Sequence, residues 1–373
     1  MGIPEIRGTT ESCKHCFMCR HACPTFLATK LDSHTPRGYA LLLSEIDHGF
    51  QSWTDSIVER FYQCSQCGLC REDCAYHWAE DEVVRNAREE IVAQERTPEK
   101  VRSIASSLIN GRAPSGRVQV SWSPVSCSPD RKNADVLYLP GCAARDSHPE
   151  ILQAMDSLLG ALHADWTVLG EEPCCGVPLW DLGYSAEAKA VAKKLAQNVH
   201  DLMPRILLTG CPHCYRSFKE LYPAWGVSLP EGLSVMHASQ YLEAQIAQGL
   251  LKPRRVEGFS RASYHDPCQL GRKMGVFDAP RRLIETILGS PPLELFHSGR
   301  MAECCGAGST MFMTDPSLTR RVAEKRIERM REIKSTVVIT ACQNCKTAFQ
   351  AASSGEGSDV KALDIVELLA MAL

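Results

Sequence analysis

Cysteine is the residue type through which this chain of 373 residues could do chemistry, because it occurs 19 times. Eight cysteines form two quartets of identical C-x2-C-x2-C-x3-C spacing: Cys13, Cys16, Cys19 and Cys23, then Cys64, Cys67, Cys70 and Cys74. Ten more form two sets of five: Cys142, Cys174, Cys175, Cys211 and Cys214, then Cys268, Cys304, Cys305, Cys342 and Cys345. Without an export signal the chain is expected in a reducing compartment, where thiols bind metals or catalyse rather than form structural disulfides.

The spacing of the two quartets is typical of cubane 4Fe–4S clusters. Three cysteines at two-residue intervals wrap one side of a cube, and the fourth, too far along to close its own loop, normally ligates the other cluster. We therefore predict one cubane on Cys13, Cys16, Cys19 and Cys74, and the other on Cys64, Cys67, Cys70 and Cys23. Zinc is the disfavoured alternative, because two identical quartets of this spacing do not resemble zinc knuckles.

The five-cysteine sets share one internal order: a lone cysteine, an adjacent pair followed by glycine, and a C-x2-C. Matching positions are 126 to 131 residues apart, which indicates an internal duplication. Adjacent cysteines such as Cys174 and Cys175 are poor co-ligands for one tetrahedral zinc, since their side chains diverge. On a cluster with several irons the pair can serve two metals. The alternative is that these cysteines are buried thiols without a function. The recurrence of the same five positions in both copies argues against this alternative.

Helical segments are expected to position the two quartets. Apolar periodicity and end signals predict helices over 36–49, 54–62, 83–92 and 97–111. Thr54 and Thr97 are the expected N-caps, with Pro98 at the first helical position. The region that carries the quartets is therefore predicted to be helical throughout.

A linker rich in Ser, Pro and Gly is expected over 111–133, and the duplicated region follows it. Short strand-like runs precede the lone cysteine and the C-x2-C of each set: 134–139, 206–209, 262–265 and 337–340. Helical stretches separate them: 149–164, 186–203, 279–288 and 316–334. This alternation predicts parallel sheets, with the cysteines at their carboxyl edges, where such folds bind ligands. A short terminal helix is expected within 360–373.

Composition and missing motifs narrow the function further. With 41 basic and 44 acidic residues the chain lacks the basic excess of nucleic-acid binders, and no run of 18 apolar residues spans a membrane. We expect a cytoplasmic chain, which a partner can hold at the inner face of a membrane. Dinucleotide, P-loop and c-haem motifs are absent from the sequence. Electrons must therefore arrive from, or leave to, a redox partner: a flavoprotein, another iron–sulfur protein or a membrane cytochrome.

Taken together, these patterns resemble the heterodisulfide reductase family. The five-cysteine sets look like its CCG domains, and the quartet region resembles the helical ferredoxin domain of its small subunit and of the fumarate reductase iron–sulfur subunit. The whole chain is similar to the fused form of that family, and also to iron–sulfur subunits of anaerobic glycerol-3-phosphate and glycolate dehydrogenases. The fold class implied is α+β and multidomain: a helical ferredoxin domain at 1–110, a linker at 111–133, and CCG domains at 134–260 and 261–373.

The resemblance also implies cofactors and two candidate functions. Each five-cysteine set would hold a noncubane 4Fe–4S cluster, and a substrate disulfide would be reductively split between the two. The first function is thus an oxidoreductase subunit that reduces or forms a disulfide or related sulfur substrate. The second is a pure electron conduit, linking a flavin-dependent dehydrogenase or electron-transferring flavoprotein to a quinone or membrane cytochrome. The sequence leaves the substrate, the direction of electron flow and any role of Cys127 open.

Other polar residues lie close to the cysteines. They are His213, His265, His297, Arg145, Arg216, Lys273 and Lys346. Hydrogen bonds to sulfur tune cluster potentials, but His265, at a predicted strand end, is interpreted as a structural residue. The four cations either offset cluster charge, hold an anionic substrate, or are solvated surface charge.

Overall fold

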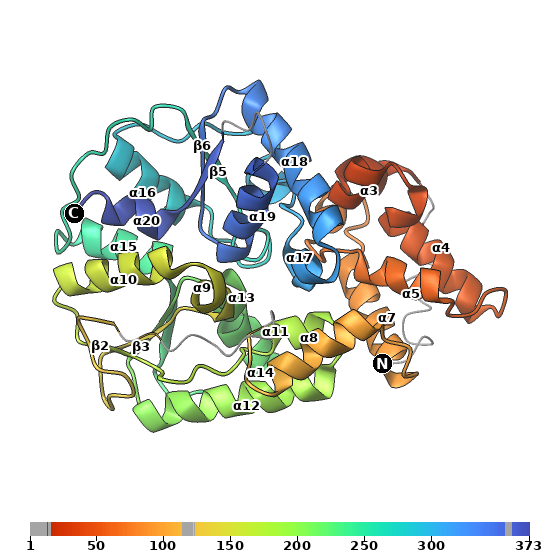
Figure 1. Ribbon diagram of the computed structural model, residues 1–373, viewed down its shortest axis with the longest axis horizontal. Helices are drawn as coiled ribbons and strands as arrows, with labels where there is room; N and C mark the ends of the chain where they lie inside the picture. The colour runs from red at the N-terminus through yellow and green to blue at the C-terminus, as the bar shows by residue number, and fades with distance from the viewer. Residues whose placement is uncertain (1–12, 14–15, 114–121, 123, 355–359) are drawn as a thin grey trace.

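The computed structural model describes residues 13, 16–113, 122, 124–354 and 360–373. A helical region at the N-terminal end lies against two α/β units, each built on its own small parallel sheet (Figure 1). This arrangement confirms the predicted α+β, multidomain fold class. Within the described residues, no helix is both long enough and apolar enough to cross a membrane.

The region that carries the quartets is helical, as predicted. Its helices are α2 (Met18–Ala22), α3 (Pro24–Thr29), α4 (Pro36–Asp47), α5 (Asp55–Tyr62), α6 (Leu69–Asp73), α7 (Glu80–Ala93) and α8 (Glu99–Ile109), with a 3₁₀ turn at Asp32–His34. Thr54 caps α5 by accepting the N–H of Ile57 over 3.3 Å. The prediction for α8 was wrong by one residue: Pro98 is extended, with ψ at 144°, and is itself the N-cap.

The first α/β unit contains a four-stranded parallel sheet with the order β2-β1-β3-β4. Its strands are β1 (Val136–Leu139), β2 (Trp166–Val168), β3 (Ile206–Thr209) and β4 (Ser234–His237). Its helices are α9 (Cys142–Ser147), α10 (Pro149–Ala161), α11 (Val177–Asp181), α12 (Ser185–Leu202), α13 (Pro212–Arg216), α14 (Tyr222–Ala224) and α15 (Ala238–Ala247), with a π-helical turn at Ser217–Leu221. The first three strands are four residues or fewer and almost fully buried, which suits a sheet covered on both faces.

The second α/β unit repeats this topology. Its strands, in the order β5-β6-β7, are β5 (Ala262–His265), β6 (Val337–Thr340) and β7 (Lys361–Asp364). Its helices are α16 (Asp278–Leu288), α17 (Met311–Thr314), α18 (Pro316–Glu332), α19 (Gln343–Ser353) and α20 (Ile365–Ala370), with 3₁₀ turns at Gly299–Met301 and Gly308–Thr310. A parallel bridge between Ser263 and Leu293 occupies the place of β2.

The end of the chain differs from the sequence-based expectation. We expected one helix within 360–373, but residues Lys361–Asp364 form β7, which pairs with β6. Helix α20 begins only at Ile365, because Asp364 is extended and its carboxylate accepts the N–H of Val366 over 3.0 Å. The apolar positions that suggest a helix are thus shared between a strand and a helix.

The two α/β units pack reciprocally through one apolar core. Helix α10 of the first unit packs on α20 of the second, and α15 of the first packs on α16 of the second. Helices α10 and α16 occupy equivalent places in the duplicated topology, as do α15 and α20, so the interface is approximately two-fold symmetric. Buried side chains such as Ile151, Leu242, Ile284 and Leu368 join both sheets in this core.

Candidate iron–sulfur sites

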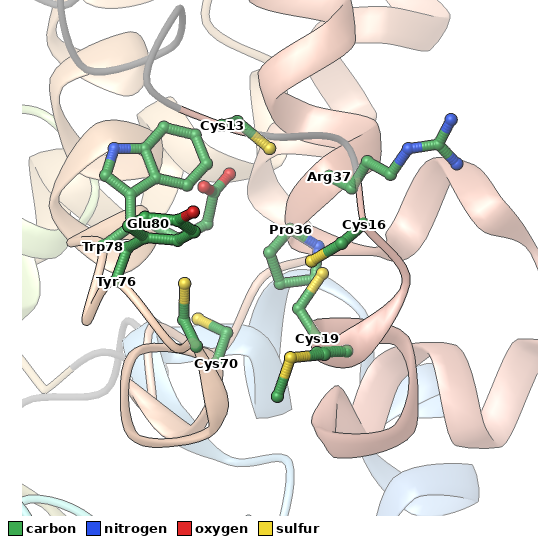
Figure 2. A pocket seen from close by; sticks show the side chains of 11 residues that line it. Cys13, Cys16, Cys19, Pro36, Arg37, Cys70, Tyr76, Trp78 and Glu80 are labelled. Carbon is green, nitrogen blue, oxygen red and sulfur yellow. The ribbon is translucent and has the colours of Figure 1, made fainter.

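The eight cysteines of the quartets line two neighbouring pockets of the helical region. The first pocket is lined by Cys13, Cys16, Cys19, Cys70 and Cys74. The second is lined by Cys23, Cys64, Cys67 and Cys70. Cys74 therefore lies with the first three cysteines of the first quartet, and Cys23 lies with the first three of the second. Cys70 borders both pockets. In Figure 2 the labelled sulfur atoms lie around one shared space.

Local sequence explains these turns. Cys23 is extended and is followed by Pro24 at the first position of α3, so the chain changes direction at the fourth cysteine. In the second quartet Gly68 has φ at 75°, a conformation that favours glycine, and it leads from Cys67 into the α6 helix that carries Cys70. The crossed ligand assignment fits this geometry and stays a prediction.

The electrostatics of these pockets favour a metal-bound state. Burial raises the pKa of the Cys19 and Cys64 thiols to about 12, so they stay protonated at neutral pH unless a metal replaces the proton. Glu80 borders both pockets, and burial beside Asp81 raises its pKa well above the usual range. Several sulfur donors around a largely apolar space are the donor set that iron–sulfur clusters take. The residues present fit such clusters.

In the first α/β unit, the five cysteines follow the carboxyl ends of three strands. Cys142 comes after β1, Cys174 and Cys175 after β2, and Cys211 and Cys214 after β3. All but Cys142 are buried. The sequence predicts the cysteines at this edge of the sheet, and the structure brings them together there.

Glycine is required beside the first of these cysteines. Gly141 has φ at 87°, and a Cβ atom at this position would lie 2.8 Å from the Cβ of Cys211. The carboxylate of Glu172 accepts the N–H of Gly141 over 2.9 Å and pairs with Arg145 over 3.1 Å. This buried ion pair fixes the turn that carries Cys142.

The second five-cysteine set has the same backbone-to-sulfur hydrogen bond as the first. The N–H of Gly306 donates to the sulfur of Cys304 over 3.3 Å, as the N–H of Gly176 donates to Cys174 over 3.4 Å. The sulfurs of Cys305 and Cys345 lie 3.2 Å apart. Each α/β unit therefore presents a cluster of mutually facing thiols, which suits a multi-iron cofactor better than separate buried cysteines.

The second quartet lies directly against the second five-cysteine set. Cys67 and Cys304 belong to one buried apolar cluster, and the nearby Cys304 thiol helps to raise the pKa of Cys67. Arg272 donates to the carbonyl of Cys67 over 2.9 Å. Arg88, which is fully buried, donates to the carbonyl of Cys64 over 2.7 Å and to that of Asp181 over 2.8 Å. Sequence patterns gave no signal for either arginine, because each acts through contacts between distant segments.

The cations that the sequence singled out are paired with carboxylates. The pairs are Arg145–Glu172, Arg216–Glu220, Lys273–Asp81, and Lys346 with both Glu150 and Glu367. The side chains of Arg145 and Lys346 are 1% exposed, so neither is solvated surface charge. Each of the four therefore neutralises an acid of the fold, and Arg216 and Lys273 also line a polar pocket together with Arg272. Cys127 is half-buried against the core that joins the two units.

A cavity opens at the first five-cysteine set and is completed by the second α/β unit. Its walls include Cys142, Cys175, Cys211 and Cys214 from the first unit. The second unit contributes Ser309, Thr310, Phe312, Met313, Asn344 and Thr347. Asn344 lies inside the second C-x2-C, between Cys342 and Cys345. The cavity thus touches segments of both five-cysteine sets.

Comparisons with known proteins agree with this geometry. Residues 9–78 match the family model of the 4Fe-4S dicluster domain, and residues 136–219 and 262–350 match that of the cysteine-rich domain, CCG. The chain is 28% identical over 390 residues to one subunit of the dihydromethanophenazine:CoB–CoM heterodisulfide reductase of Methanosarcina barkeri, and the match covers 97% of this chain and 94% of that relative.

Two further relatives carry other oxidoreductase names. The chain is 25% identical to one subunit of the fumarate reductase (CoM/CoB) of Methanothermobacter marburgensis, over 99% of this chain and 72% of that relative. It is 24% identical to the EtfAB:quinone oxidoreductase of Syntrophomonas wolfei, over 96% of this chain and 57% of that protein. The chain is therefore a heterodisulfide reductase-like iron–sulfur protein, in which a 4Fe–4S dicluster domain and two cysteine-rich domains share one polypeptide.

Proposed function

We propose that this chain is the iron–sulfur subunit of an oxidoreductase complex that reduces, or forms, a disulfide or related sulfur substrate. The quartets would hold two cubane clusters, in the crossed arrangement given above, and the five-cysteine sets would hold two noncubane clusters. When bound, such clusters supply one-electron transfer and iron atoms that bind sulfur. The chain's own residues hold these centres, link them, and shape the space next to them.

The observation that carries the proposal is the cavity shared by the two cysteine-rich domains. Four cysteines of the first set border it from one side, and Asn344, from within the second C-x2-C, borders it from the other. A disulfide has two sulfur atoms to be accepted, and a cavity that touches both sets offers a place for each. Phe312 and Met313 make one wall apolar, which limits water next to the reacting sulfurs.

The contact between the dicluster domain and the second cysteine-rich domain supports an electron path. Cys67, a proposed ligand of the second cubane, lies in one buried apolar cluster with Cys304 of the second five-cysteine set. Cys16 of the first quartet is exposed, whereas Cys67 is buried. We therefore propose that a redox partner exchanges electrons at the first quartet. A flavoprotein, an iron–sulfur protein or a membrane cytochrome would serve as this partner.

The proposal is tested by metal analysis and EPR on anaerobically purified protein, before and after adding the CoB–CoM heterodisulfide or glutathione disulfide. About 16 irons per chain are expected for four four-iron clusters. A paramagnetic signal that forms only with a disulfide would support the reductase. Near 8 irons would contradict cluster binding by the five-cysteine sets.

Variants of the paired cysteines sharpen this test. Cys175→Ser or Cys305→Ser should each remove the signal of one noncubane cluster and leave the cubane spectra intact. Cys127→Ser is the matched control, because this half-buried cysteine belongs to neither a quartet nor a five-cysteine set and its replacement should change no signal. Loss of all signals in Cys175→Ser would contradict the proposal that the dicluster domain and the cysteine-rich domains bind their clusters independently.

The electron conduit remains a second candidate, favoured by the relative named EtfAB:quinone oxidoreductase, which aligns with 96% of this chain. In that case all four clusters would be present, but no thiol or disulfide would change the spectra. The same samples therefore decide between the two functions. Reduction of the clusters by an electron-transferring flavoprotein, with full iron and no disulfide response, would establish the conduit.

A further inference from the structure

The two cysteine-rich domains differ at one buried position beside their cysteines. In the first domain Leu139 ends β1, pairs in register with Thr209, and precedes Cys142 by three residues. In the second domain His265 ends β5, pairs in register with Thr340, and precedes Cys268 by three residues. Leu139 and His265 therefore occupy the same place in the duplicated fold.

The first domain shows what the fold itself needs at this place. Leu139 is fully buried and belongs to an apolar cluster that includes Cys175, Cys211 and Cys214. An aliphatic side chain thus fills the space between the end of the strand and the cysteines. The strand, its register and the following turn form without any polar group at this position.

The second domain places an imidazole in this space. His265 is 1% exposed, and neither ring nitrogen has a hydrogen-bond partner among the residues that the structure describes. A ring nitrogen and the sulfurs of Cys305 and Cys345 all lie within 4.8 Å of one another. The imidazole and the ring of Phe349 form a T-shaped pair, with ring centroids 4.8 Å apart and planes at 86°. The hydroxyl of Thr340 also donates to the carbonyl of His265 over 3.3 Å.

Such a position is unfavourable for histidine in the absence of a polar partner. A buried donor or acceptor without a hydrogen bond destabilises the fold, whereas the leucine of the first domain carries no such cost. The ring is held by Phe349 and by its strand, so it cannot turn to solvent. The groups that it faces are proposed cluster ligands, and their cofactor would bring sulfur acceptors to the same spot.

We propose that His265 donates an N–H hydrogen bond to a sulfur of the cluster held by the second five-cysteine set, and that the first set has no equivalent donor at Leu139. This inference rests on the proposed function, since it assumes that the set holds a cluster. A hydrogen bond stabilises the extra negative charge that a reduced cluster carries, so it raises the reduction potential. The two noncubane sites are then unequal, and the second, next to Cys67, is the easier to reduce.

The test uses the full chain, purified anaerobically, with only its histidines labelled with ¹⁵N. Pulsed EPR on the reduced protein measures nitrogen couplings to each cluster, and a redox titration measures the potentials. The decisive variant is His265→Leu, because leucine already stands at this place in the first domain and should pack. His200→Asn is the control, since His200 lies near the end of α12 and lines none of the pockets that contain the cysteines.

We expect a ¹⁵N coupling on the cluster of the second five-cysteine set in the wild type and in His200→Asn, and its loss in His265→Leu. The potential of that cluster should become more negative in His265→Leu, while those of the other three stay unchanged. In His265→Gln, whose amide can also donate, the potential should return toward the wild-type value. A coupling on this cluster that persists in His265→Leu, or one that is absent from it in the wild type, would overturn the inference.

The iron content separates this result from the proposed function. Wild type with about 16 irons and no histidine coupling would remove the role of His265 and leave the clusters in place. Wild type with about 8 irons would instead contradict the proposed function itself. A coupling as large as that of an iron-bound imidazole would overturn the hydrogen bond in favour of direct ligation.

Discussion

The guanidinium of Arg272, in the second cysteine-rich domain, donates a hydrogen bond to the backbone carbonyl of Cys67 in the dicluster domain over 2.9 Å. The same group donates to the carbonyls of Arg300, over 2.8 Å, and Ala302. It thus joins the loop of the second quartet to two turns beside the second five-cysteine set. Three backbone acceptors fix this contact more tightly than surface ion pairs would.

A glycine at the same contact provides the first prediction. A Cβ atom on Gly308 would overlap the backbone carbonyl of Ser65, between two proposed ligands of the second quartet. Because Gly308 does not have a positive φ, alanine itself would not be strained there. Gly308→Ala should therefore weaken this interface by about 1–3 kcal/mol, as overpacking does, and slow electron transfer from the cubanes to the second five-cysteine set. Thermal unfolding and rapid-freeze EPR measure the two effects.

The control for this variant is Gly160→Ala. Gly160 lies inside α10, where a Cβ atom would come no closer than 3.4 Å to Ser126, and alanine in a helix is favoured over glycine by about 0.5–1 kcal/mol. This variant should unfold at the same or a higher temperature and transfer electrons at the wild-type rate. If the two variants had the same unfolding temperature and the same rate of electron transfer, the close approach of Gly308 to Ser65 would not determine the stability of this interface.

The second prediction concerns the crossed ligands of the two cubanes. Cys74 lines the pocket of the first quartet, and Cys23 lines the pocket of the second. Cys74→Ser should therefore alter the same EPR signal as Cys16→Ser, and Cys23→Ser the same signal as Cys67→Ser. If Cys74→Ser and Cys67→Ser shared one signal, each quartet would serve its own cluster and the crossing would be wrong.

Much of the fold and of the candidate sites follows from local signals in the sequence. The strands at 262–265 and 337–340 lie where they were predicted, because each short run directly precedes a cysteine motif that recurs at the same place in the first copy of the duplication. The grouping of ten cysteines at two sheet edges follows from the duplication and from the rule that ligands bind beyond strand ends. The helical nature of the dicluster domain follows from apolar periodicity.

Other features depend on contacts between distant segments. The sequence shows Arg88 only as one residue of an amphipathic helix, yet its guanidinium binds carbonyls of Cys64 and Asp181, which come from different domains. His265 was interpreted as a structural strand-end residue, since neither its burial nor its lack of partners can be read from its neighbours in sequence. The strand at 361–364 exists because β6 offers an unpaired edge, which no local pattern reveals.

A third prediction concerns pH. Burial, together with the nearby carboxylate of Glu367, raises the pKa of Asp364 to about 7, although the N–H of Val366 and the charge of Lys346 act in the opposite direction. In an unfolded chain this pKa is about 3.9. The folded protein thus holds the proton more tightly, so the stability from this group is lost as pH rises toward 7 and is absent above it.

Asparagine at this position would keep an N-cap without an ionisable group. Asp364→Asn should therefore gain stability relative to wild type as pH rises, by about 1 kcal/mol between pH 6 and pH 8. Denaturant unfolding at the two pH values checks this difference. A gap between the two proteins that is independent of pH would show that Asp364 does not titrate in this range.

The last prediction concerns the buried pair of Arg145 and Glu172. Their side chains are 1% and 4% exposed, and Glu172 also accepts the N–H of Gly141, directly before Cys142. Burial raises the pKa of Glu172 to about 7, so its carboxylate is fully charged only above this pH. There, Glu172→Gln would leave the charge of Arg145 without its counter-ion, and breaking a buried pair in this way costs about 3–5 kcal/mol. Because the same carboxylate holds the turn at Gly141, we also expect iron to be lost from the first five-cysteine set only.

Glu324→Gln is the matched control, because Glu324 forms an exposed pair with Arg320 whose loss costs at most about 0.5 kcal/mol. Thermal unfolding and iron analysis of both variants check the prediction. A lower unfolding temperature with full iron would mean that Glu172 serves stability alone. Full iron and an unchanged unfolding temperature would show that the pair contributes neither to stability nor to iron binding. Iron lost together with the signal of one noncubane cluster, while the second set keeps its own, would show that this pair positions Cys142 for ligation.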